Sequence, residues 1–311
     1  MKPRTLYIMG RGHSGTTFLD AVLGNAPDVE SIGEVMSGLN RGLDERCSCG
    51  QRLGDCAYWH AVGTEYSEIS GGRQLISDGS WMWHTSDIRS MPSLWFIRSI
   101  RRSQRWSRYA EIENDLVLAV SRVSGATTIV DSNKEYTRGL LLLRAEPSSR
   151  VIHLHRSLSS ILGSHYYRRK ERHEPYKFMK REYHLDTVFL PMSLLVALSW
   201  SIGMILGVAQ QLRYPDRVLQ VRYESLVSDP ERVLGTIGRF ASIDTAQIRE
   251  TISQGGAFRV GHNIGGDELR HDGEYRLVRN VHGRRSVPWY HRVLSAPFAA
   301  PGYLIRMFLP K

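Results

Sequence analysis

The sequence predicts an α/β fold: a three-layer sandwich with a central parallel sheet, crossover helices and a P-loop-like phosphate-binding turn. Three observations lead to this prediction. Short apolar runs alternate with segments of helical periodicity along the chain. The first apolar run ends in a glycine-rich turn, and 311 residues of ordinary globular composition can bury a sizeable core. We therefore expect a single domain over residues 1–311.

The elements follow one another in order. The apolar runs predict strands at 4–9, 127–130, 151–154 and 218–222. Helices are expected at 16–23, through 140–143, onward from Ser157, and after Ser228-Asp229-Pro230, where a capping residue precedes a proline suited to the first helical position.

Three longer stretches complete the chain. Residues 38–125, rich in Trp, Arg and Ser, predict a helical insertion that could cover the ligand end of the sheet. Residues 255–311 predict a C-terminal segment and a tail. Residues 187–212 contain no charged side chain and are long enough to cross a bilayer. Their interruption by Pro, Ser and Gly favours a buried core helix.

The net charge of +10 favours anionic partners. No zinc-finger, RNA-recognition or helix-turn-helix signature accompanies the charge, so we expect no nucleic-acid partner. The first apolar run is too short for a signal peptide and enters the glycine-rich turn directly. This predicts a cytoplasmic protein, with peripheral membrane contact through the C-terminal tail as an open alternative.

The cysteines are Cys47, Cys49 and Cys56, an odd number within ten residues. They are one ligand short of a structural zinc site unless His60 supplies the fourth. We expect free thiols, with a local disulfide and a zinc site as the alternatives.

The turn after the first strand reads Gly10-Arg11-Gly12-His13-Ser14-Gly15-Thr16-Thr17. Backbone N–H groups of such a turn, together with the positive end of the following helix, favour a bound anion. Glycines allow the backbone to approach a phosphate closely, and the hydroxyl groups can donate further hydrogen bonds. We expect this loop to bind phosphate; a tight turn without a ligand is the alternative.

The same loop is close to a Walker A motif but has Thr16 where that motif requires lysine. This argues against a kinase or NTPase. The Ile129-Val130-Asp131 run is compatible with a Walker B strand and keeps a P-loop kinase acting on a small molecule as the second hypothesis. A nucleotide- or polyanion-binding module without catalysis is the third.

The run from His13 to Thr17 resembles the 5′-phosphosulfate loop of sulfotransferases that use 3′-phosphoadenosine 5′-phosphosulfate (PAPS), written [KR]SGTT. The resemblance implies that Gly12, Ser14, Gly15, Thr16 and Thr17 bind this donor. This chain departs from the pattern at His13, where the family has lysine or arginine. A protonated histidine beside an anion can still donate, and Arg11 could supply the missing fixed charge.

Two further segments resemble the family in the same order. Arg156 ends a predicted strand and Ser164 follows eight residues later, as in the family's 3′-phosphate motif. Eight residues make just over two helical turns, so the serine returns to the face that the arginine addresses. The segment around Tyr223 is similar to "RYEDLVxDP", which places this tyrosine near the nucleotide or in the core.

The catalytic residues are implied by resemblance to the tyrosylprotein and carbohydrate branches and to bacterial relatives. Glu34 closes a stretch similar to "hPdv...GE" and is expected to be the base, with His13 as its rival. Lys134 lies in an "NK" segment and is expected to stabilise the transferring group. Arg270 is the preferred residue for closing the nucleotide site.

The resemblance implies a sulfotransferase (EC 2.8.2.-) that moves the sulfuryl group of PAPS to a hydroxyl or amine by in-line displacement, without a metal. Such transfer depends mostly on positioning and electrostatics. The acceptor is expected to be a small molecule, a glycan or a lipid.

Overall fold

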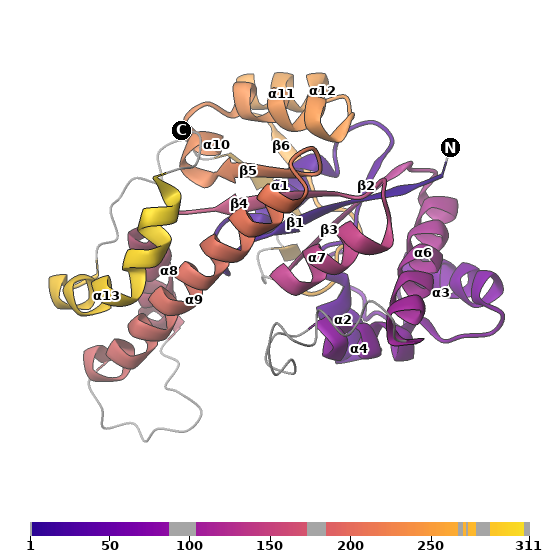
Figure 1. Ribbon diagram of the computed structural model, residues 1–311. Coiled ribbons are helices and arrows are strands. Elements are labelled where there is room, and N and C mark those ends of the chain that lie inside the picture. Colours follow the sequence, from indigo (N-terminus) through magenta and orange to yellow (C-terminus); the bar gives the residue numbers. More distant parts are fainter. Residues whose placement is uncertain are drawn as a thin grey trace.

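The computed structural model describes residues 2–86, 104–172, 185–266, 270–271, 273–277 and 287–307. Its centre is a sheet of five parallel strands in the order β2-β3-β1-β4-β5 (Figure 1). In register, Thr5 of the first strand lies opposite Ile129, and Ile8 opposite Ile152. The strands of this sheet are β1 (Arg4–Met9), β2 (Val29–Ser31), β3 (Thr128–Lys134), β4 (Arg150–His155) and β5 (Val218–Arg222).

Helices join and cover these strands. They are α1 (Thr16–Leu23), α2 (Val35–Arg41), α3 (Ala57–Ser70), α4 (Leu75–Ser86), α6 (Gln104–Ser124), α7 (Tyr136–Ala145), α8 (Leu158–Arg172), α9 (Leu185–Arg213), α10 (Tyr223–Ser228), α11 (Pro230–Ala241), α12 (Ala246–Ser253) and α13 (Trp289–Arg306). A short antiparallel pair, β6 (Ala257–Arg259) and β7 (Glu274–Arg276), stands apart from the main sheet.

The two faces of the sheet are covered by different helices. Because side chains alternate along a strand, Leu6 and Ile8 enter the core formed with α1, α11 and α12, whereas Tyr7 and Met9 pack against α7. Figure 1 shows α11 and α12 above the sheet, and α7 and α9 on its other side. The predicted α/β architecture with a central parallel sheet is confirmed.

Most predicted elements occur where the sequence indicated them. The first strand and the first helix have the predicted bounds, and so does β5. The Asp229 carboxylate accepts a hydrogen bond from the backbone N–H of Arg232, which confirms the predicted cap of α11. The strand β2 was not predicted, because three residues are too few to show an alternating pattern.

The predicted insertion of residues 38–125 contains α3, α4 and α6 among its described residues. With α2 they enclose a hydrophobic core of their own, which includes Trp59, Tyr66, Met82 and Tyr109. The helix α6 also packs on β2 and β3, and α4 packs on α7. The insertion is therefore attached along the β2 edge of the sheet.

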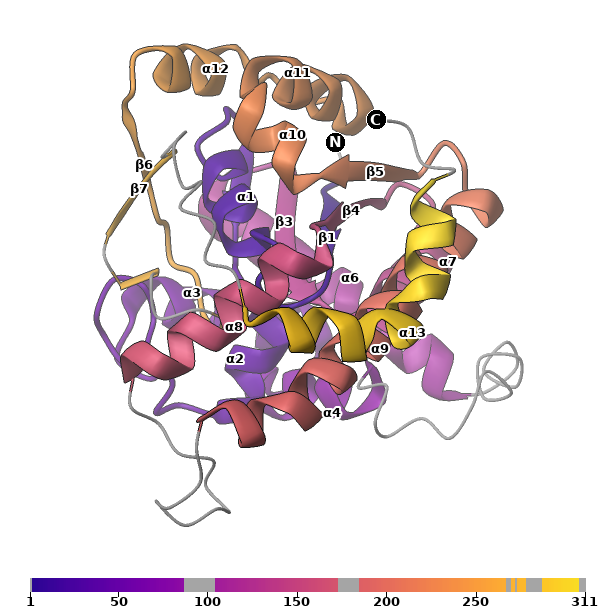
Figure 2. The same cartoon turned by 90° about the vertical axis from the view of Figure 1, so that its left-hand side faces the viewer.

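The apolar segment after residue 187 forms α9, which packs against α8 and α13 (Figure 2). Its inner side chains Val196, Ala197, Trp200 and Met204 are buried. Its outer face is exposed, and Leu195 has 62% of its surface accessible. By length and composition, Leu190–Arg213 is the one described helix that could cross a membrane, and 44% of it is buried. The predicted buried core helix is therefore correct only for one face.

Candidate active site

The glycine-rich turn lies at the carboxyl edge of the sheet, between β1 and α1. Its start is fixed to the neighbouring strand because the Gly10 N–H donates to the Lys134 carbonyl at 3.2 Å. The backbone is left-handed at His13 (φ 68°) and at Gly15 (φ 91°). A Cβ on Gly15 would lie 2.3 Å from Cε2 of Tyr223, so only glycine fits this close approach.

The turn presents polar groups that the described protein does not satisfy. Ser14 is fully buried, and its hydroxyl has no hydrogen-bond partner among the described residues. No side chain caps α1, whose first residue is Thr16, so the N–H groups of its first turn remain available. Buried polar groups without partners are rare in proteins. Their position at a helix N-terminus fits a bound anion.

The predicted second phosphate site converges on the same turn. The Arg156 Nη1 donates to the carbonyl oxygen of His13 at 3.0 Å, and the Ser164 hydroxyl lies 3.0 Å from Nδ1 of the same residue. The structure therefore brings together the arginine, the serine and the glycine-rich turn from three separate segments.

The Arg156 guanidinium packs on an aromatic ring and remains partly available. It lies 4.4 Å from the centre of the Tyr223 ring, which itself packs on Gly15. Its Nε is buried and has no hydrogen-bond partner among the described residues. A planar guanidinium fixed in this way suits bidentate binding of a phosphate. Tyr223 supports the loop and the arginine together.

Two residues that support this arginine were not singled out from the sequence. The Trp200 indole N–H donates to the Arg156 carbonyl at 2.9 Å, and the Glu224 carboxylate accepts the Ser157 N–H at 2.8 Å. Burial alone would raise the pKa of Glu224, but hydrogen bonds, chiefly that from the Ser157 N–H, lower it below its usual value. Glu224 directly follows Tyr223 in the sequence, and this position could have identified it. Nothing in the sequence around Trp200 indicated its role.

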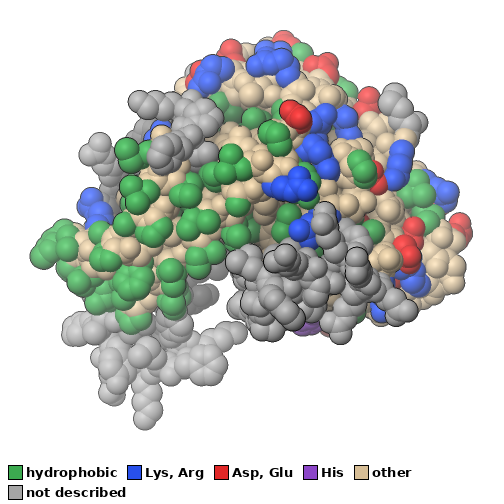
Figure 3. Space-filling view, in the orientation of Figure 1, with side chains coloured by type: hydrophobic (Ala, Val, Ile, Leu, Met, Phe, Trp, Pro, Cys, Tyr) green, Lys and Arg blue, Asp and Glu red, His purple; other side chains and the backbone are tan. Residues whose placement is uncertain are grey.

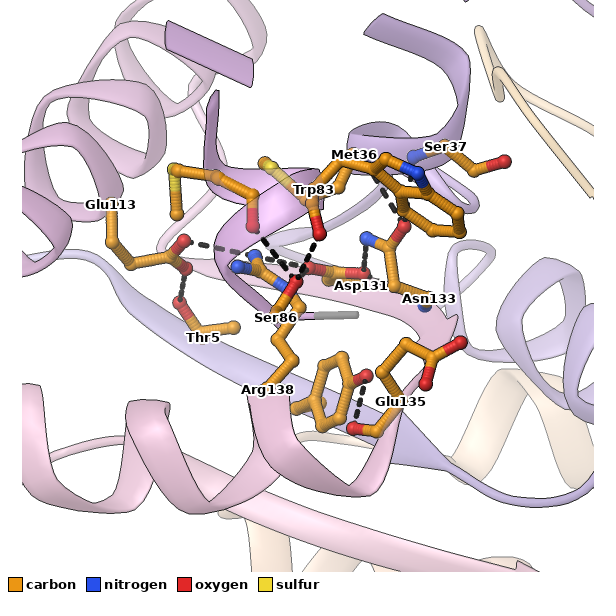
Figure 4. A network of polar contacts seen from close by, with 12 residues as sticks. Thr5, Met36, Ser37, Trp83, Ser86, Glu113, Asp131, Asn133, Glu135 and Arg138 are labelled. Atoms are coloured by element: carbon orange, nitrogen blue, oxygen red, sulfur yellow. Dashed lines mark hydrogen bonds and ion pairs between the residues drawn. The ribbon is translucent and has the colours of Figure 1, made fainter. Parts of the chain in front are cut away.

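Glu34 and Lys134, the predicted base and the predicted stabilising cation, form an ion pair with each other. They come from neighbouring strands: Glu34 follows β2 and precedes α2, and Lys134 ends β3 in a left-handed conformation (φ 71°). The Glu34 N–H donates to the Ile264 carbonyl at 2.8 Å. The Asn133 amide oxygen accepts the N–H groups of Met36 and Ser37, which fixes the start of α2 (Figure 4).

Asp131 belongs to a buried polar network with Arg138 and Glu113 (Figure 4). Its carboxylate accepts from Nε of Arg138 at 2.8 Å, and Nη2 of the same arginine donates to Glu113. Burial lowers the pKa of Arg138, but the two carboxylates outweigh this and raise it well above its usual value. Since the Asp131 carboxylate is committed to this arginine, it is not positioned as a Walker B residue, and the kinase hypothesis loses its support.

The two remaining predicted arginines lie in other surroundings. The Arg11 Nε donates to the Ser199 hydroxyl of α9 at 2.8 Å. Arg270 is buried, and its Nη2 donates to Glu45 at 2.7 Å and to the Arg46 carbonyl at 3.0 Å. These contacts connect Arg270 to the insertion. Closure of the nucleotide site by Arg270 therefore stays a prediction.

A cavity of about 450 Å³ lies within the insertion. It is lined by residues of α2, α3 and α4 and their connections, including Leu39, Trp59 and Thr64. None of the predicted site residues lines it, so its position does not connect it with the glycine-rich turn.

An anion-binding turn at the carboxyl edge of a parallel sheet defines the class of α/β proteins that bind phosphorylated ligands. Within that class, Thr16 in place of the Walker lysine and the committed Asp131 separate this chain from nucleoside triphosphate hydrolases. A sulfotransferase family model matches residues 4–247. The chain belongs to the sulfotransferase family.

Solved structures of sulfotransferases align with this chain. A sulfotransferase from Mycobacterium avium aligns with a TM-score of 0.54 and 13% identity, over 100% of this chain and 78% of that one. The sulfotransferase domain of the olefin synthase from Synechococcus PCC 7002 aligns with a TM-score of 0.47 and 17% identity, over 96% of this chain and 98% of that one. At 13% identity the likeness to the Mycobacterium avium protein concerns the fold alone. No curated protein sequence matches the chain.

Proposed function

We propose that this sulfotransferase takes the sulfuryl group from PAPS and transfers it to a hydroxyl or amine of a small-molecule, glycan or lipid acceptor. One observation supports the donor above all others. Two buried polar groups without partners among the described residues, the Ser14 hydroxyl and the Arg156 Nε, lie on segments joined through His13. A ligand with two separated phosphate groups fits this arrangement.

In this proposal the loop from Gly12 to Thr17 holds the 5′-phosphosulfate, and Arg156 with Ser164 holds the 3′-phosphate. The donor, when bound, supplies the sulfuryl group together with a good leaving group. No residue of the chain then has to act as a nucleophile. The protein provides position and charge, which are the main requirements of such transfers.

Glu34 takes the proton of the acceptor, and Lys134 provides positive charge beside it. The ion pair between them orients the carboxylate before an acceptor arrives. His13, whose carbonyl and ring contact Arg156 and Ser164, is more closely tied to donor binding than to proton transfer. This division of roles separates the two candidate bases.

The donor is tested by thermal shift with 3′-phosphoadenosine 5′-phosphate against ATP with magnesium. A ligand present at about 100 times its dissociation constant should stabilise the folded protein by roughly 2.7 kcal/mol. Stabilisation by ATP with magnesium and not by the bisphosphate would refute the proposal. If the bisphosphate stabilises the protein, incubation of radiolabelled PAPS with extracts of the source organism identifies the acceptor.

The base is tested by two variants measured side by side. Glu34→Gln removes the proton acceptor and should lower kcat about 10²–10⁴-fold while affinity for the bisphosphate stays within about twofold. His13→Asn should lower affinity for the bisphosphate instead. Full turnover by Glu34→Gln would exclude this residue as the base.

The apolar face of α9 and α13 supports a second part of the proposal, contact with a membrane surface. Figure 3 shows hydrophobic side chains gathered on the left of the molecule, where these helices lie. Contiguous exposed apolar patches of this kind mark interaction sites. The exposed residues on the two helices include Leu195, Leu198, Ile202, Ile205, Val293, Leu294, Phe298 and Leu304.

Co-sedimentation with phosphatidylcholine–phosphatidylglycerol vesicles tests this contact. Leu198→Glu combined with Phe298→Glu should reduce the bound fraction at least about fivefold, because two charges would enter the apolar interface. Leu43→Glu, at an exposed leucine of the insertion, is the matched control. Equal sedimentation of the wild type and the double variant would refute membrane contact through this face.

A further inference from the structure

Four potential metal ligands meet where the insertion contacts the loop after β6. Cys47, Cys49 and Cys56 lie between α2 and α3, and His262 is more than 200 positions further along the chain. The three sulfur atoms and one imidazole nitrogen all lie within 4.8 Å of one another. His60, the fourth ligand that spacing suggested, is not part of this cluster.

Three of the six separations between ligand atoms in the cluster are close to those of a tetrahedral metal site. The His262 Nδ1 lies 3.4 Å from Sγ of Cys56 and 3.6 Å from Sγ of Cys47. Cys49 and Cys56 have their Sγ atoms 3.7 Å apart. Zinc–sulfur bonds of about 2.3 Å and zinc–nitrogen bonds of about 2.0–2.1 Å place tetrahedral ligands roughly 3.5–3.8 Å apart. A disulfide would need about 2.05 Å, and none of the three cysteines is paired.

The surrounding residues hold the ligands in this arrangement. Tyr58 stacks on the His262 ring at 4.6 Å with an interplanar angle of 5°. The Trp59 indole N–H donates to the His262 carbonyl at 2.7 Å. The Cys47 N–H donates to the Gln51 carbonyl at 2.9 Å, which closes a tight turn around Cys49. Such outer contacts orient ligands and are typical of metal sites.

We propose that these four residues bind one structural Zn²⁺ ion. Three thiolates and one imidazole form a ligand set that favours zinc, and four protein ligands leave no position open for a substrate. Cys47 and Cys56 are buried, so two of the three sulfur ligands would be shielded from solvent. The inference does not depend on the proposed sulfuryl transfer.

The zinc site fastens two loops that flank the candidate base. Beside the cluster, the Ser48 N–H donates to the Asn263 carbonyl and the Asn263 N–H donates to the Ser48 hydroxyl, both at 2.9 Å. The next residue, Ile264, accepts the Glu34 N–H. The metal thus fixes the backbone against which Glu34 is set. Only this link between the zinc site and the base Glu34 rests on the proposed function.

The test is the zinc content of the full chain, purified under reducing conditions and without metal-affinity steps. Plasma mass spectrometry should find about one zinc per chain. Cys49→Ser changes an exposed thiol and His262→Asn removes the nitrogen ligand; each should lower zinc content at least about tenfold. His60→Asn, at an exposed histidine one helical turn after Cys56, is the matched control and should retain the metal.

Cobalt gives a second measurement on the same protein. Replacement of zinc by Co²⁺ should produce the visible bands of a tetrahedral site together with thiolate-to-cobalt charge transfer, and His262→Asn should change both. The inference would be overturned if the protein still contained no zinc after reconstitution with zinc. It would also be overturned if His60→Asn lost the metal while His262→Asn kept it. A non-reduced mass lower by two hydrogens would also overturn it, since it indicates a disulfide. Binding of the bisphosphate is measured separately and can fail or succeed independently.

Discussion

Replacing Arg156 tests the second phosphate site directly. Its guanidinium is fixed by the His13 carbonyl and the Tyr223 ring, and its Nε has no partner among the described residues. A bidentate contact to phosphate comprises two charge-assisted hydrogen bonds of about 1.5–3 kcal/mol each. Arg156→Ala should therefore cost roughly 3–6 kcal/mol, which weakens binding about 10²–10⁴-fold.

Isothermal titration with 3′-phosphoadenosine 5′-phosphate measures this loss. Arg156→Lys keeps the charge but not the planar fork, so its affinity should fall between those of the wild type and the alanine variant. Arg122→Ala, which removes an exposed arginine paired with Glu65, is the control for net charge and should bind normally. Affinity of Arg156→Ala within about twofold of the wild type would refute the assignment of this site.

Three predictions concern stability. Gly15→Ala places a methyl group 2.3 Å from the neighbouring tyrosine ring in a left-handed backbone, and urea unfolding should show a loss of about 1–3 kcal/mol. At Gly12 an added Cβ would meet no other atom within 4 Å, so Gly12→Ala should change the free energy of unfolding by less than about 0.5 kcal/mol. Equal losses in Gly15→Ala and Gly12→Ala would contradict the reasoning. Asp131→Asn removes one of the two carboxylates that pair with the buried Arg138 and should cost about 3–5 kcal/mol; a loss below about 1 kcal/mol would show that the network is not structural. Burial lowers the pKa of His153 to about 4, below its value in the unfolded chain. The neutral buried histidine therefore contributes fully to stability above the unfolded pKa, and this contribution is lost as the pH falls toward 4, because the unfolded chain binds the proton first. Between pH 7 and pH 5 His153 alone should lower the free energy of unfolding by about 2 kcal/mol, so the fall in His153→Gln should be smaller than that in the wild type by about this amount; identical pH profiles would exclude this histidine as a cause.

Local patterns predicted much of this protein. The glycine-rich turn, its strand and its helix were visible because they depend on neighbouring residues alone. The spacing from Arg156 to Ser164 was likewise readable, since Arg156 directly follows β4 and Ser164 lies on α8, which begins two residues later. The fold class followed from the alternation of these elements.

Contacts between distant segments could not be read in this way. The ion pair of Glu34 with Lys134 depends on the order β2-β3-β1, and β2 was too short to be recognised. The commitment of Asp131 to Arg138, which removes the Walker B interpretation, was equally invisible.

The sequence by itself determined the class of fold, the anion-binding turn and the residue types available for chemistry. Only the tertiary structure decided which of them meet: it placed Arg270 against Glu45, and His262 rather than His60 beside the three cysteines. The physical reason is that hydrogen bonds along a turn or a helix are local, whereas ligand clusters and buried ion pairs form where packing brings remote backbone segments together.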